Sequence, residues 1–287
     1  MAEALSDYLE LTKPRIIVLL LITTAAAMVM AARGLPPLNI LFWTLLGGAL
    51  SSGSAGALNC VYDSDIDGLM RRTMRRPIPQ SRISIINATT FGVVLGIAGF
   101  TILYLLVNPL AAWLSLAGNV YYVVIYTMWL KRLTSLNIVI GGAAGSIPPL
   151  VGWAAVTDHV GAPALALFAL IFLWTPPHFW SLALMTETDY DRANIPMLPN
   201  VAGEERTKRE ILYYTLLLVI ASLVFYPLHI MGPVYAAAAA LLGGIFLYDT
   251  ARMLYSTGRA WARRTFKFSL LYLALMCTIM VVDSIIA

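Results

Sequence analysis

Residues 84–107 read SIINATTFGVVLGIAGFTILYLLV and contain no charged side chain. The stretch is longer than the roughly 20 apolar residues that a helix needs to cross a bilayer. Similar runs recur along the whole chain, separated by short polar segments. Their length and composition predict a membrane protein that is built from helices.

We identify nine such runs, at about residues 16–33, 38–61, 84–107, 109–129, 137–156, 161–185, 211–229, 232–254 and 266–286. Of the 287 residues, 60% are hydrophobic and 12% are charged, whereas a typical soluble domain has about 25% charged residues. Little chain remains between the runs. We therefore expect one domain, residues 1–287, with an all-α fold: a polytopic bundle of nine transmembrane helices.

The amino-terminal 15 residues contain three acidic side chains beside Lys13 and Arg15, so no clearly basic segment precedes the first run. The first run is therefore interpreted as a retained span and not as a signal peptide. The chain has two cysteines, Cys60 and Cys277, which are too few for a disulfide framework and lack a metal-binding spacing. We interpret them as small packing residues.

The basic residues are distributed unequally between the two ends of the predicted helices. With nine spans, every Lys and Arg except Arg33 falls in the amino terminus or in the loops after spans 2, 4, 6 and 8. By the positive-inside rule, this side is predicted to face the cytoplasm. Topology therefore accounts for the net charge of +4, and we infer no nucleic-acid partner.

The loops after spans 2 and 6 are long and contain similar acidic clusters. The first cluster is Asp63, Asp65 and Asp67, and the second is Glu187, Asp189 and Asp191. The same number of residues, 124, separates Asp63 from Glu187 and Asp67 from Asp191. Spans 1–4 (about 16–129) and 5–8 (about 137–254) are thus predicted to be two parallel repeats, with span 9 added, and such repeats place sites at their interface.

The first cluster has the side chains of a metal–diphosphate site. Asn59, Asp63 and Asp67 are spaced i, i+4, i+8 and share one face of a helix. Magnesium is typically held by one or two carboxylates together with water and substrate phosphates. Guanidinium groups match phosphate oxygens, and the arginines that follow the cluster supply them: Arg71, Arg72, Arg75 and Arg76.

An alternative is that these acids only end two helices and that the arginines only set the topology. Charged residues that flank loops are common in membrane proteins. The occurrence of two such clusters, after equivalent spans and on the same side, favours a binding site.

His178 is a polar residue in the interior of span 6, and such residues are expected to be functional. It follows Pro176 and Pro177, which should kink the helix and free backbone carbonyls. This histidine could bind a metal, act as a base or stabilise a carbocation, or it could simply hydrogen bond to a neighbouring helix. His159 and His229 lie at the outer ends of spans and are expected to be exposed. Asn119, Tyr122 and Tyr126 in span 4 could line the same cavity as His178 or could be ordinary packing or interfacial residues, and they are not ranked as site residues.

Several segments resemble a known family. Asn59-Cys-Val-Tyr-Asp63-Ser-Asp-Ile-Asp67 resembles the first Asn/Asp-rich motif of the UbiA superfamily of intramembrane prenyltransferases. Three further segments resemble one branch of it, the protoheme IX farnesyltransferases (heme O synthases): Asp67-Gly-Leu-Met-Arg-Arg-Thr-Met-Arg-Arg-Pro77, Pro176-Pro-His-Phe-Trp180, and Asp189-Tyr-Asp-Arg-Ala-Asn-Ile-Pro-Met-Leu-Pro199. Residues 11–15 and the region 131–153 are also similar, so that the resemblance covers nearly the whole chain.

The resemblance implies a nine-helix bundle around a central cavity that opens to the cytoplasm, in the cell (inner) membrane. The implied donor is farnesyl diphosphate, the implied acceptor is heme b, the ion is Mg²⁺, and the product is heme O for terminal oxidase assembly. Heme A synthase or a terminal oxidase are the candidate protein partners.

The resemblance also implies roles for individual residues. The metal ligands would be Asn59, Asp63, Asp67 and Asp189. The catalytic residues would be Asp63, Asp67, His178 and Asp189, with His178 beside the heme. The substrate-binding residues would be Lys13, Arg71, Arg72, Arg75, Arg76, Lys131 and His178.

The second acidic motif permits two interpretations. Related enzymes that act on phenolic acceptors carry a regular Asp-x-x-x-Asp motif, and the i, i+4 pair here is Glu187 and Asp191. The heme branch indicates Asp189 instead. We favour Asp189, because the following Ile195-Pro-Met-Leu-Pro199 also fits that branch.

Three other functions remain as alternatives. A prenyltransferase for a phenolic or quinone-precursor acceptor would share the acidic motifs but not the His178 and Asp189-Tyr190 segments. A membrane transporter should place ionisable groups near the bilayer midplane, whereas these acids gather at one side. A heme-handling assembly factor would have no evident use for the acidic clusters.

Overall fold

The computed structural model describes residues 2–286, and every regular element within them is a helix. A short helix, α1 (Ala2–Leu11), precedes the first long one. The long helices are α2 (Pro14–Ala32), α3 (Leu38–Tyr62), α5 (Ile85–Leu106), α6 (Pro109–Val120), α7 (Asn137–Thr157), α8 (Ala162–Met185), α10 (Leu198–Val224), α11 (Pro233–Leu254) and α12 (Ala260–Ile286). Two short helices, α4 (Ser64–Asp67) and α9 (Glu187–Arg192), follow α3 and α8.

The helix that begins as α6 changes its winding. It continues as a π-helix, η1 (Tyr121–Trp129), and ends in a short 3₁₀ turn, η2 (Leu130–Arg132). A π-helix of this length is unusual, and π-bulges often lie at functional sites. The altered winding leads directly to Lys131 and Arg132, which are described below.

Among the described residues, eight helices are long and apolar enough to cross a membrane. They are α2, α3, α5, the continuous helix Pro109–Arg132, α7, α8, α11 and α12. Each coincides with a predicted run, and most boundaries agree within a few residues. The all-helical membrane fold is therefore confirmed, and Pro176 and Pro177 do not end α8.

The seventh predicted run, about 211–229, falls in α10, which starts earlier and ends earlier than the run. Residues 204–210, which we expected in a loop, are helical, and this part of the prediction is wrong. Three ion pairs, each one helical turn apart, lie in this segment, and such pairs stabilise a charged helix. A kink at Gly203, with φ 82°, separates the start of α10 from its main part.

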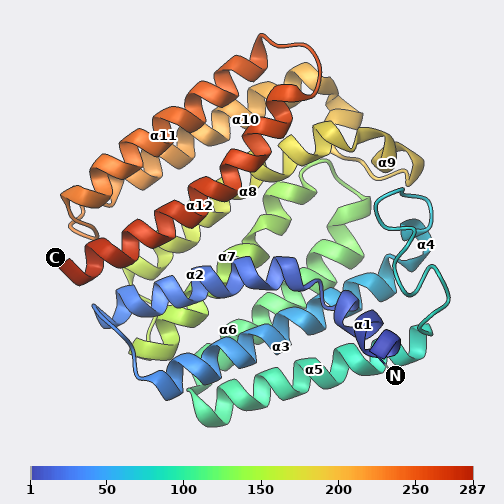
Figure 1. Ribbon diagram of the computed structural model, residues 1–287, viewed down its shortest axis with the longest axis horizontal. Coiled ribbons are helices and arrows are strands. Elements are labelled where there is room, and N and C mark those ends of the chain that lie inside the picture. The colour runs from blue at the N-terminus through green and yellow to red at the C-terminus, as the bar shows by residue number, and fades with distance from the viewer. Residues whose placement is uncertain (1, 287) are drawn as a thin grey trace.

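The long helices pack in chain order around a ring. Each contacts the next, and the ring closes where α12 packs against α2. Further contacts cross the ring between α2 and α7 and between α8 and α12. In Figure 1 the long helices run roughly side by side, with α4 and α9 at the same end of the molecule.

The α3–α5 contact depends on glycine. A Cβ atom added to Gly99 would lie 2.8 Å from the carbonyl oxygen of Gly47, and one added to Gly47 would lie 2.6 Å from the Leu103 side chain. Small residues let the backbones of membrane helices approach closely. This close approach holds α3, whose end carries the first acidic cluster, against α5.

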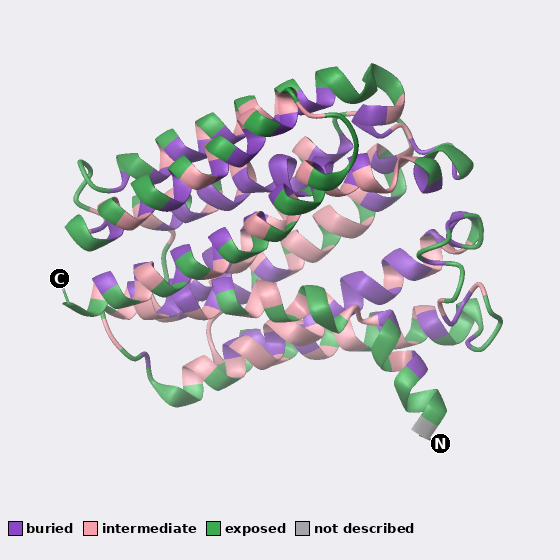
Figure 2. Ribbon diagram, turned by 45° about the horizontal axis from the view of Figure 1, so that its top comes forward, coloured by how far each residue is buried: buried purple, intermediate pink, exposed green. Residues whose placement is uncertain are grey.

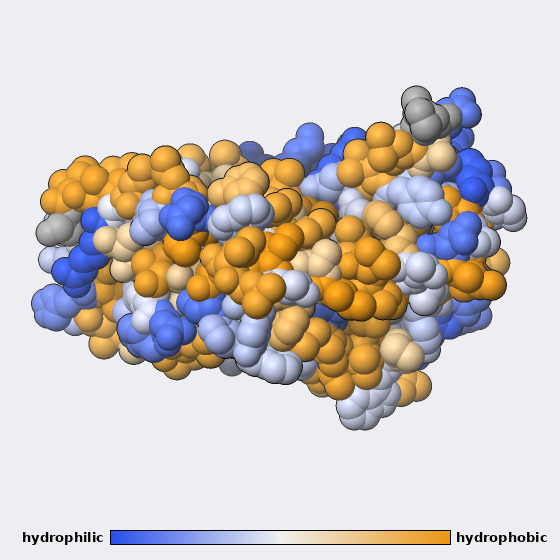
Figure 3. Space-filling view, turned by 90° about the horizontal axis from the view of Figure 1, so that it is seen from below, coloured by the Kyte–Doolittle hydropathy of each residue, from blue (hydrophilic) through white to orange (hydrophobic). Residues whose placement is uncertain are grey.

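The outer surface of the molecule suits a lipid environment. Large apolar side chains such as Ile86, Ile97 and Leu105 of α5 are exposed. Figure 3 shows one face whose middle is largely hydrophobic, with hydrophilic residues toward both its left-hand and its right-hand end. Figure 2 shows that buried residues follow the helix surfaces that face other helices.

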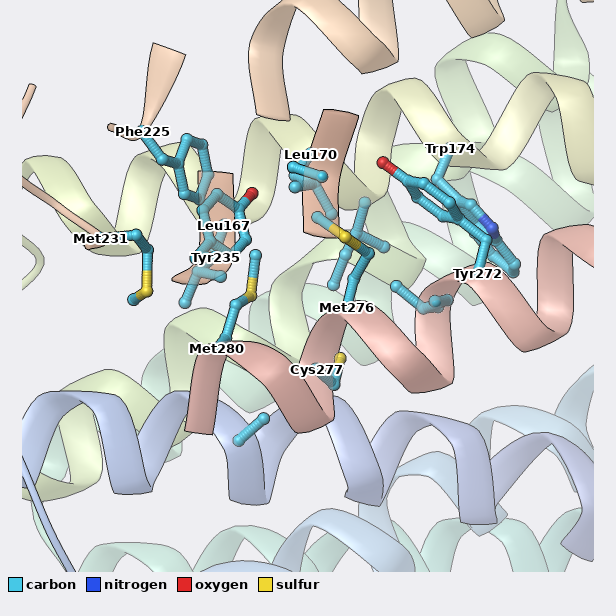
Figure 4. Packing of buried hydrophobic residues seen from close by; sticks show 14 of the residues in the cluster. Leu167, Leu170, Trp174, Phe225, Met231, Tyr235, Tyr272, Met276, Cys277 and Met280 are labelled. Atoms are coloured by element: carbon cyan, nitrogen blue, oxygen red, sulfur yellow. The ribbon is translucent and has the colours of Figure 1, made fainter. Parts of the chain in front are cut away.

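The largest buried apolar cluster lies between α2, α8, α10, α11 and α12. Figure 4 shows part of this cluster, including Trp174 of α8 and Tyr272 and Met276 of α12. A second apolar cluster lies at the end of the molecule that carries α4 and α9. It contains Ile66 and Met70 from the first polar segment and Tyr190, Ile195 and Met197 from the second, so these two segments share a core.

Candidate functional site

The end of α3 brings three predicted site residues together. Asn59 lies in the last turn of α3, Asp63 follows the helix, and Asp67 ends α4. The backbone N–H of Asp63 donates to the Asn59 carbonyl at 2.9 Å, and that of Asp67 donates to the Asp63 carbonyl at 2.8 Å. Because successive helical turns connect the three residues, their side chains share one face, as the i, i+4, i+8 spacing predicts.

All three side chains are buried: Asn59 is 3% exposed, and Asp63 and Asp67 are each 1% exposed. Buried carboxylates require charge partners, and each has one. Lys131 Nζ lies 2.5 Å from Asp63 Oδ2, and Arg76 Nη1 lies 2.7 Å from Asp67 Oδ2.

The amide of Asn59 is also held. Its Nδ2 donates to Thr127 Oγ1 at 3.0 Å, and its Oδ1 accepts a hydrogen bond from Lys13 Nζ. Thr127 belongs to the π-helical segment η1, so α3 is fixed to that segment at this point. Burial lowers the pKa of the Lys13 ammonium.

Within residues 2–286, one oxygen of each carboxylate has no hydrogen-bond partner. Asp63 Oδ1 and Asp67 Oδ1 are both buried and unpaired; the Arg132 Nη2 atom is 3.9 Å from Asp63 Oδ1, too far for a hydrogen bond. Leaving a buried charged acceptor unsatisfied costs about 1–3 kcal/mol or more. The two atoms are therefore suited to receive a cation.

This donor set fits Mg²⁺ and not a metal held by protein ligands alone. Within residues 2–286 no group of three or more His, Cys, Asp or Glu side chains is arranged to hold a metal ion. Magnesium usually takes one or two carboxylates and completes its coordination with water and substrate phosphate oxygens. Asp63 and Asp67 are the carboxylates that could take this role, with Asn59 as a neighbouring amide.

The second acidic segment meets the first through one residue. Asp189, in α9, is 6% exposed, and its Oδ1 accepts a hydrogen bond of 3.2 Å from the backbone N–H of Arg71. Next to it, the Tyr190 hydroxyl accepts a bond of 3.1 Å from Arg72 Nη2, and the Arg72 guanidinium lies 5.0 Å from the centre of the same ring. These contacts join segments that are 118 residues apart in the chain.

The alternative pair in this segment is oriented differently. Asp191 is exposed, and its carboxylate accepts a hydrogen bond from Asn200 Nδ2. Glu187 is half-buried, and its backbone carbonyl accepts from the same amide group at 3.1 Å. Asp189, not Asp191, is therefore the acid that the fold holds against the first segment.

The four predicted arginines differ in their surroundings. Arg76 is tied to Asp67 and Arg72 to Tyr190. Arg71 and Arg75 are exposed, and within the described part of the chain neither side chain forms an ion pair. These two guanidinium groups are available to an anionic ligand.

Arg132 forms a separate pair at the rim of the site. Its Nη1 and Nη2 donate to the two carboxylate oxygens of Asp65 at 2.7 and 2.8 Å. These hydrogen bonds lower the pKa of Asp65, whose side chain is 60% exposed. Asp65 is the one acid of the first cluster that points to solvent.

His178 lies in α8 and is buried. Its Nδ1 is 2.7 Å from Ser269 Oγ in α12, and its ring stacks on Trp174 and Phe266. No contact joins His178 directly to the acidic clusters in the described residues. His159 and His229 are exposed, as predicted.

Sequence reasoning did not identify Thr127, Arg132 or Ser269 as part of this arrangement. The sequence does mark Lys131 and Arg132 as candidates, because they are the only charged residues at the end of span 4. It does not mark Thr127 or Ser269, because a single hydroxyl within an apolar helix is common. Their roles depend on which helices become neighbours.

Comparison with known proteins relates the chain to membrane prenyltransferases. The UbiA prenyltransferase family matches residues 20–272. A protein of Synechocystis named protoheme IX farnesyltransferase is 54% identical over 287 residues, which cover 99% of this chain and 91% of the relative. A protein of the same name from Gloeobacter violaceus is 53% identical, with 99% and 94% of the two chains covered.

Solved structures share the fold at lower identity. The structure of a digeranylgeranylglyceryl phosphate synthase has a TM-score of 0.81 and 20% identity, and the match covers 99% of this chain and 100% of the other. A UbiA homologue from Archaeoglobus fulgidus, bound to DMAPP and Mg²⁺, has a TM-score of 0.68 and 14% identity over 96% and 99% of the two chains.

Proposed function

The chain belongs to the UbiA prenyltransferase family, and we propose that it transfers the farnesyl group of farnesyl diphosphate to a vinyl group of heme b, giving heme O. Relatives that carry the name protoheme IX farnesyltransferase are more than 50% identical over nearly the whole chain. The observation that carries the chemistry is the pair of buried, unpaired carboxylate oxygens of Asp63 and Asp67. They provide the negative charge that a cation on the diphosphate requires.

In this proposal Asp63 and Asp67, with Asn59 beside them, would hold Mg²⁺ on the diphosphate. Mg²⁺, when bound, supplies positive charge that stabilises the pyrophosphate leaving group. Asp63 and Asp67 would each contribute the oxygen that has no partner among the described residues. Asp189 would join the ligand set only when the diphosphate is bound, as the member from the second half of the chain; its hydrogen bond from the backbone N–H of Arg71 supports this role.

The basic residues would bind the diphosphate and neutralise the charge that develops on it. Lys131 and Arg76 already neutralise Asp63 and Asp67, and Lys13 lies beside Asn59. Arg71 and Arg75 are free to bind phosphate oxygens or the propionates of the heme. Fixed cationic groups that face a developing negative charge are usually a large part of such catalysis.

The reaction itself breaks the bond between C1 of the farnesyl group and the diphosphate oxygen, and the electron pair leaves with pyrophosphate. The electron-rich vinyl group of heme then bonds to the allylic cation. Water adds to the resulting cation on the heme side chain and loses a proton, giving the hydroxyethylfarnesyl group. The apolar interior must exclude water before that step, because early capture would give farnesol.

The membrane arrangement completes the proposal. We propose that the chain is one intramembrane domain with nine spans: the eight long apolar helices and, as the seventh span, α10, which packs against α8 and α11. The basic residues favour an orientation in the cell membrane with the amino terminus and both acidic segments on the cytoplasmic side, around a central cavity. Heme A synthase or a terminal oxidase would then receive the product, and co-purification would test this.

The test is incubation of the purified, detergent-solubilised protein with heme b, farnesyl diphosphate and Mg²⁺, followed by mass spectrometry. We expect a product with the added hydroxyethylfarnesyl mass, lost when the metal is chelated. Asp63→Asn should abolish it. Asp158→Asn is the matched control, since Asp158 is exposed and has φ 53°, a conformation that asparagine tolerates.

Two results would contradict the proposal in different ways. Prenylation of a phenolic acid but not of heme would retain the diphosphate site and overturn the acceptor. Full activity of the Asp63→Asn variant on heme would retain the acceptor and overturn the metal site.

A further inference from the structure

Ser269 of α12 forms hydrogen bonds with two side chains of α8. The Trp174 indole nitrogen donates to the Ser269 backbone carbonyl at 2.8 Å. One helical turn later, His178 Nδ1 lies 2.7 Å from Ser269 Oγ. All three residues are buried, and Figure 4 shows Trp174 directed toward α12. Ser269 is thus the point at which α12 holds the histidine of α8.

The contacts of Ser269 favour one tautomer of His178. The Ser269 hydroxyl lies 2.7 Å from the Phe266 carbonyl oxygen of its own helix and can donate its single proton there. With its proton on that side, Ser269 Oγ accepts a hydrogen bond from the imidazole. His178 Nδ1 then carries a proton, and in a neutral ring Nε2 carries the free lone pair.

Aromatic neighbours restrict how the ring can be used. The Trp174 ring stacks on it at 4.4 Å with an interplanar angle of 16°, and the Phe266 ring at 4.7 Å with an angle of 23°. Stacked rings occupy the faces of the imidazole. The lone pair of Nε2 lies in the ring plane, away from the stacked faces, and among the described residues the ring's hydrogen bond is made at Nδ1.

The surroundings also favour a neutral ring. Within residues 2–286, the aromatic and hydrogen-bond contacts of His178 are with Trp174, Phe179, Phe266 and Ser269, which carry no charge. An imidazolium at this position would be a buried cation without a counter-ion, which is strongly unfavourable. A neutral electron-pair donor is therefore favoured over a group that takes up a proton.

We propose that Ser269 is a positioning residue that holds His178 in the Nδ1–H tautomer and thereby presents Nε2 as a ligand to the iron of the heme substrate. The inference rests on the proposed function, because that function brings heme to the site. It assigns a role to Ser269 and one specific atom of His178 to the heme. Histidine ligands commonly donate their second ring N–H to a partner that fixes their orientation.

The tautomer can be measured without any substrate. The chain has three histidines, so a His159→Gln, His229→Asn background leaves only His178; asparagine suits the φ of 54° at position 229. In this background, with ¹⁵N-labelled histidine and no polyhistidine tag, we expect solid-state NMR to show a protonated Nδ1 and an unprotonated Nε2. Ser269→Ala should abolish this single pattern, and Ser269→Thr, which keeps the hydroxyl, should restore it.

Heme binding provides the second measurement. Ferric heme b titrated into the same background should give the absorption and electron paramagnetic resonance spectra of a histidine-ligated heme, which His178→Ala removes. Ser269→Ala should weaken heme binding about tenfold. Ser146→Ala is the matched control, because Ser146 is also fully buried and bonds only to its own helix.

The outcomes separate this inference from the proposed function. An Nε2–H tautomer, or a ligated-heme spectrum that survives His178→Ala, would overturn the assignment of His178 and Ser269 even if the protein farnesylates heme. A histidine-ligated heme without any farnesylated product would support the assignment and count against the proposed reaction instead.

Discussion

The two acidic segments match in sequence but have opposite patterns of burial. In the first, the outer acids Asp63 and Asp67 are buried and the central Asp65 is exposed. In the second, the central Asp189 is buried, whereas Asp191 is exposed and Glu187 is half-buried. Positions 124 residues apart correspond between the two segments, and each buried acid of one segment corresponds to a more exposed acid of the other.

The position of each acid around its local helix explains this reversal. Hydrogen bonds of successive helical turns connect Asn59, Asp63 and Asp67, so that all three face inward. In the second segment a new short helix begins at Glu187, and the i, i+4 pair of that helix turns outward while Asp189 faces the first segment. The position that corresponds to Asn59 is Ala183, which has no side-chain oxygen. The matching positions of the acids therefore do not give the two segments equivalent sets of buried oxygen atoms.

The largest effect should come from the outer acids of the first segment. We expect Asp63→Asn to lower the rate of heme farnesylation by about 10³-fold, because it removes the charge that a metal on the leaving group requires. The sequence counterpart, Glu187→Gln, should change the rate less than about threefold. Initial rates of both purified variants at saturating Mg²⁺ would test this. Equal losses would mean that the two segments contribute equally, against the burial pattern.

The next effect concerns the second segment. Asp189→Asn should lower the rate by about 10²-fold, since one charged member of the site is lost, while Asp191→Asn should remain close to the wild-type rate. The apparent Mg²⁺ requirement, measured as the metal concentration for half-maximal rate, should rise only in the Asp189 variant. A larger loss of rate in Asp191→Asn than in Asp189→Asn would instead identify the i, i+4 pair, Glu187 and Asp191, as the metal-binding residues.

A smaller effect is expected from the basic partners. Lys131 reaches Asp63 from η2, whereas Lys208 in the second half bonds to the Ser256 carbonyl and to Glu204. Lys131→Met should raise the KM for farnesyl diphosphate about tenfold, and Lys208→Met should leave it unchanged. Steady-state kinetics with varied diphosphate would distinguish them, and a similar KM in both variants would remove Lys131 from the binding site.

The apolar runs predicted the helices well because a bilayer imposes both length and composition on a spanning segment. The start of α10 was not predicted, because its charged residues are stabilised as a helix by ion pairs within the segment. The alignment of Asn59, Asp63 and Asp67 was predictable because it needs only the helical period.

The partners of these residues could not be predicted in the same way. The contact of Lys131 with Asp63 spans 68 residues, and that of His178 with Ser269 spans 91. Such contacts depend on which helices pack together, and a single sequence contains no local signal for that. The inward orientation of Asp189 depends in turn on where α9 begins.

The smallest effect is expected at Asp65, the exposed acid of the first segment and the sequence counterpart of Asp189. Hydrogen bonds from Arg132 lower its pKa below the ordinary value of 3.8. A carboxyl group whose pKa is lower in the folded state than in the unfolded state stabilises the fold at pH values above its unfolded-state pKa. This contribution to stability is lost as the pH falls through the folded-state pKa. Because the pair is exposed, Asp65→Asn should cost less than about 1 kcal/mol of stability at neutral pH, and the difference in thermal unfolding temperature from the wild type should shrink below pH 3.8.

The farnesylation rate of Asp65→Asn should stay within about twofold of the wild-type rate, since the Asp65 side chain is exposed to solvent and the two unpaired oxygens are buried. If this variant instead lost as much activity as Asp189→Asn, the positions paired by sequence would be the functional equivalents, and burial would have misidentified the acids that matter.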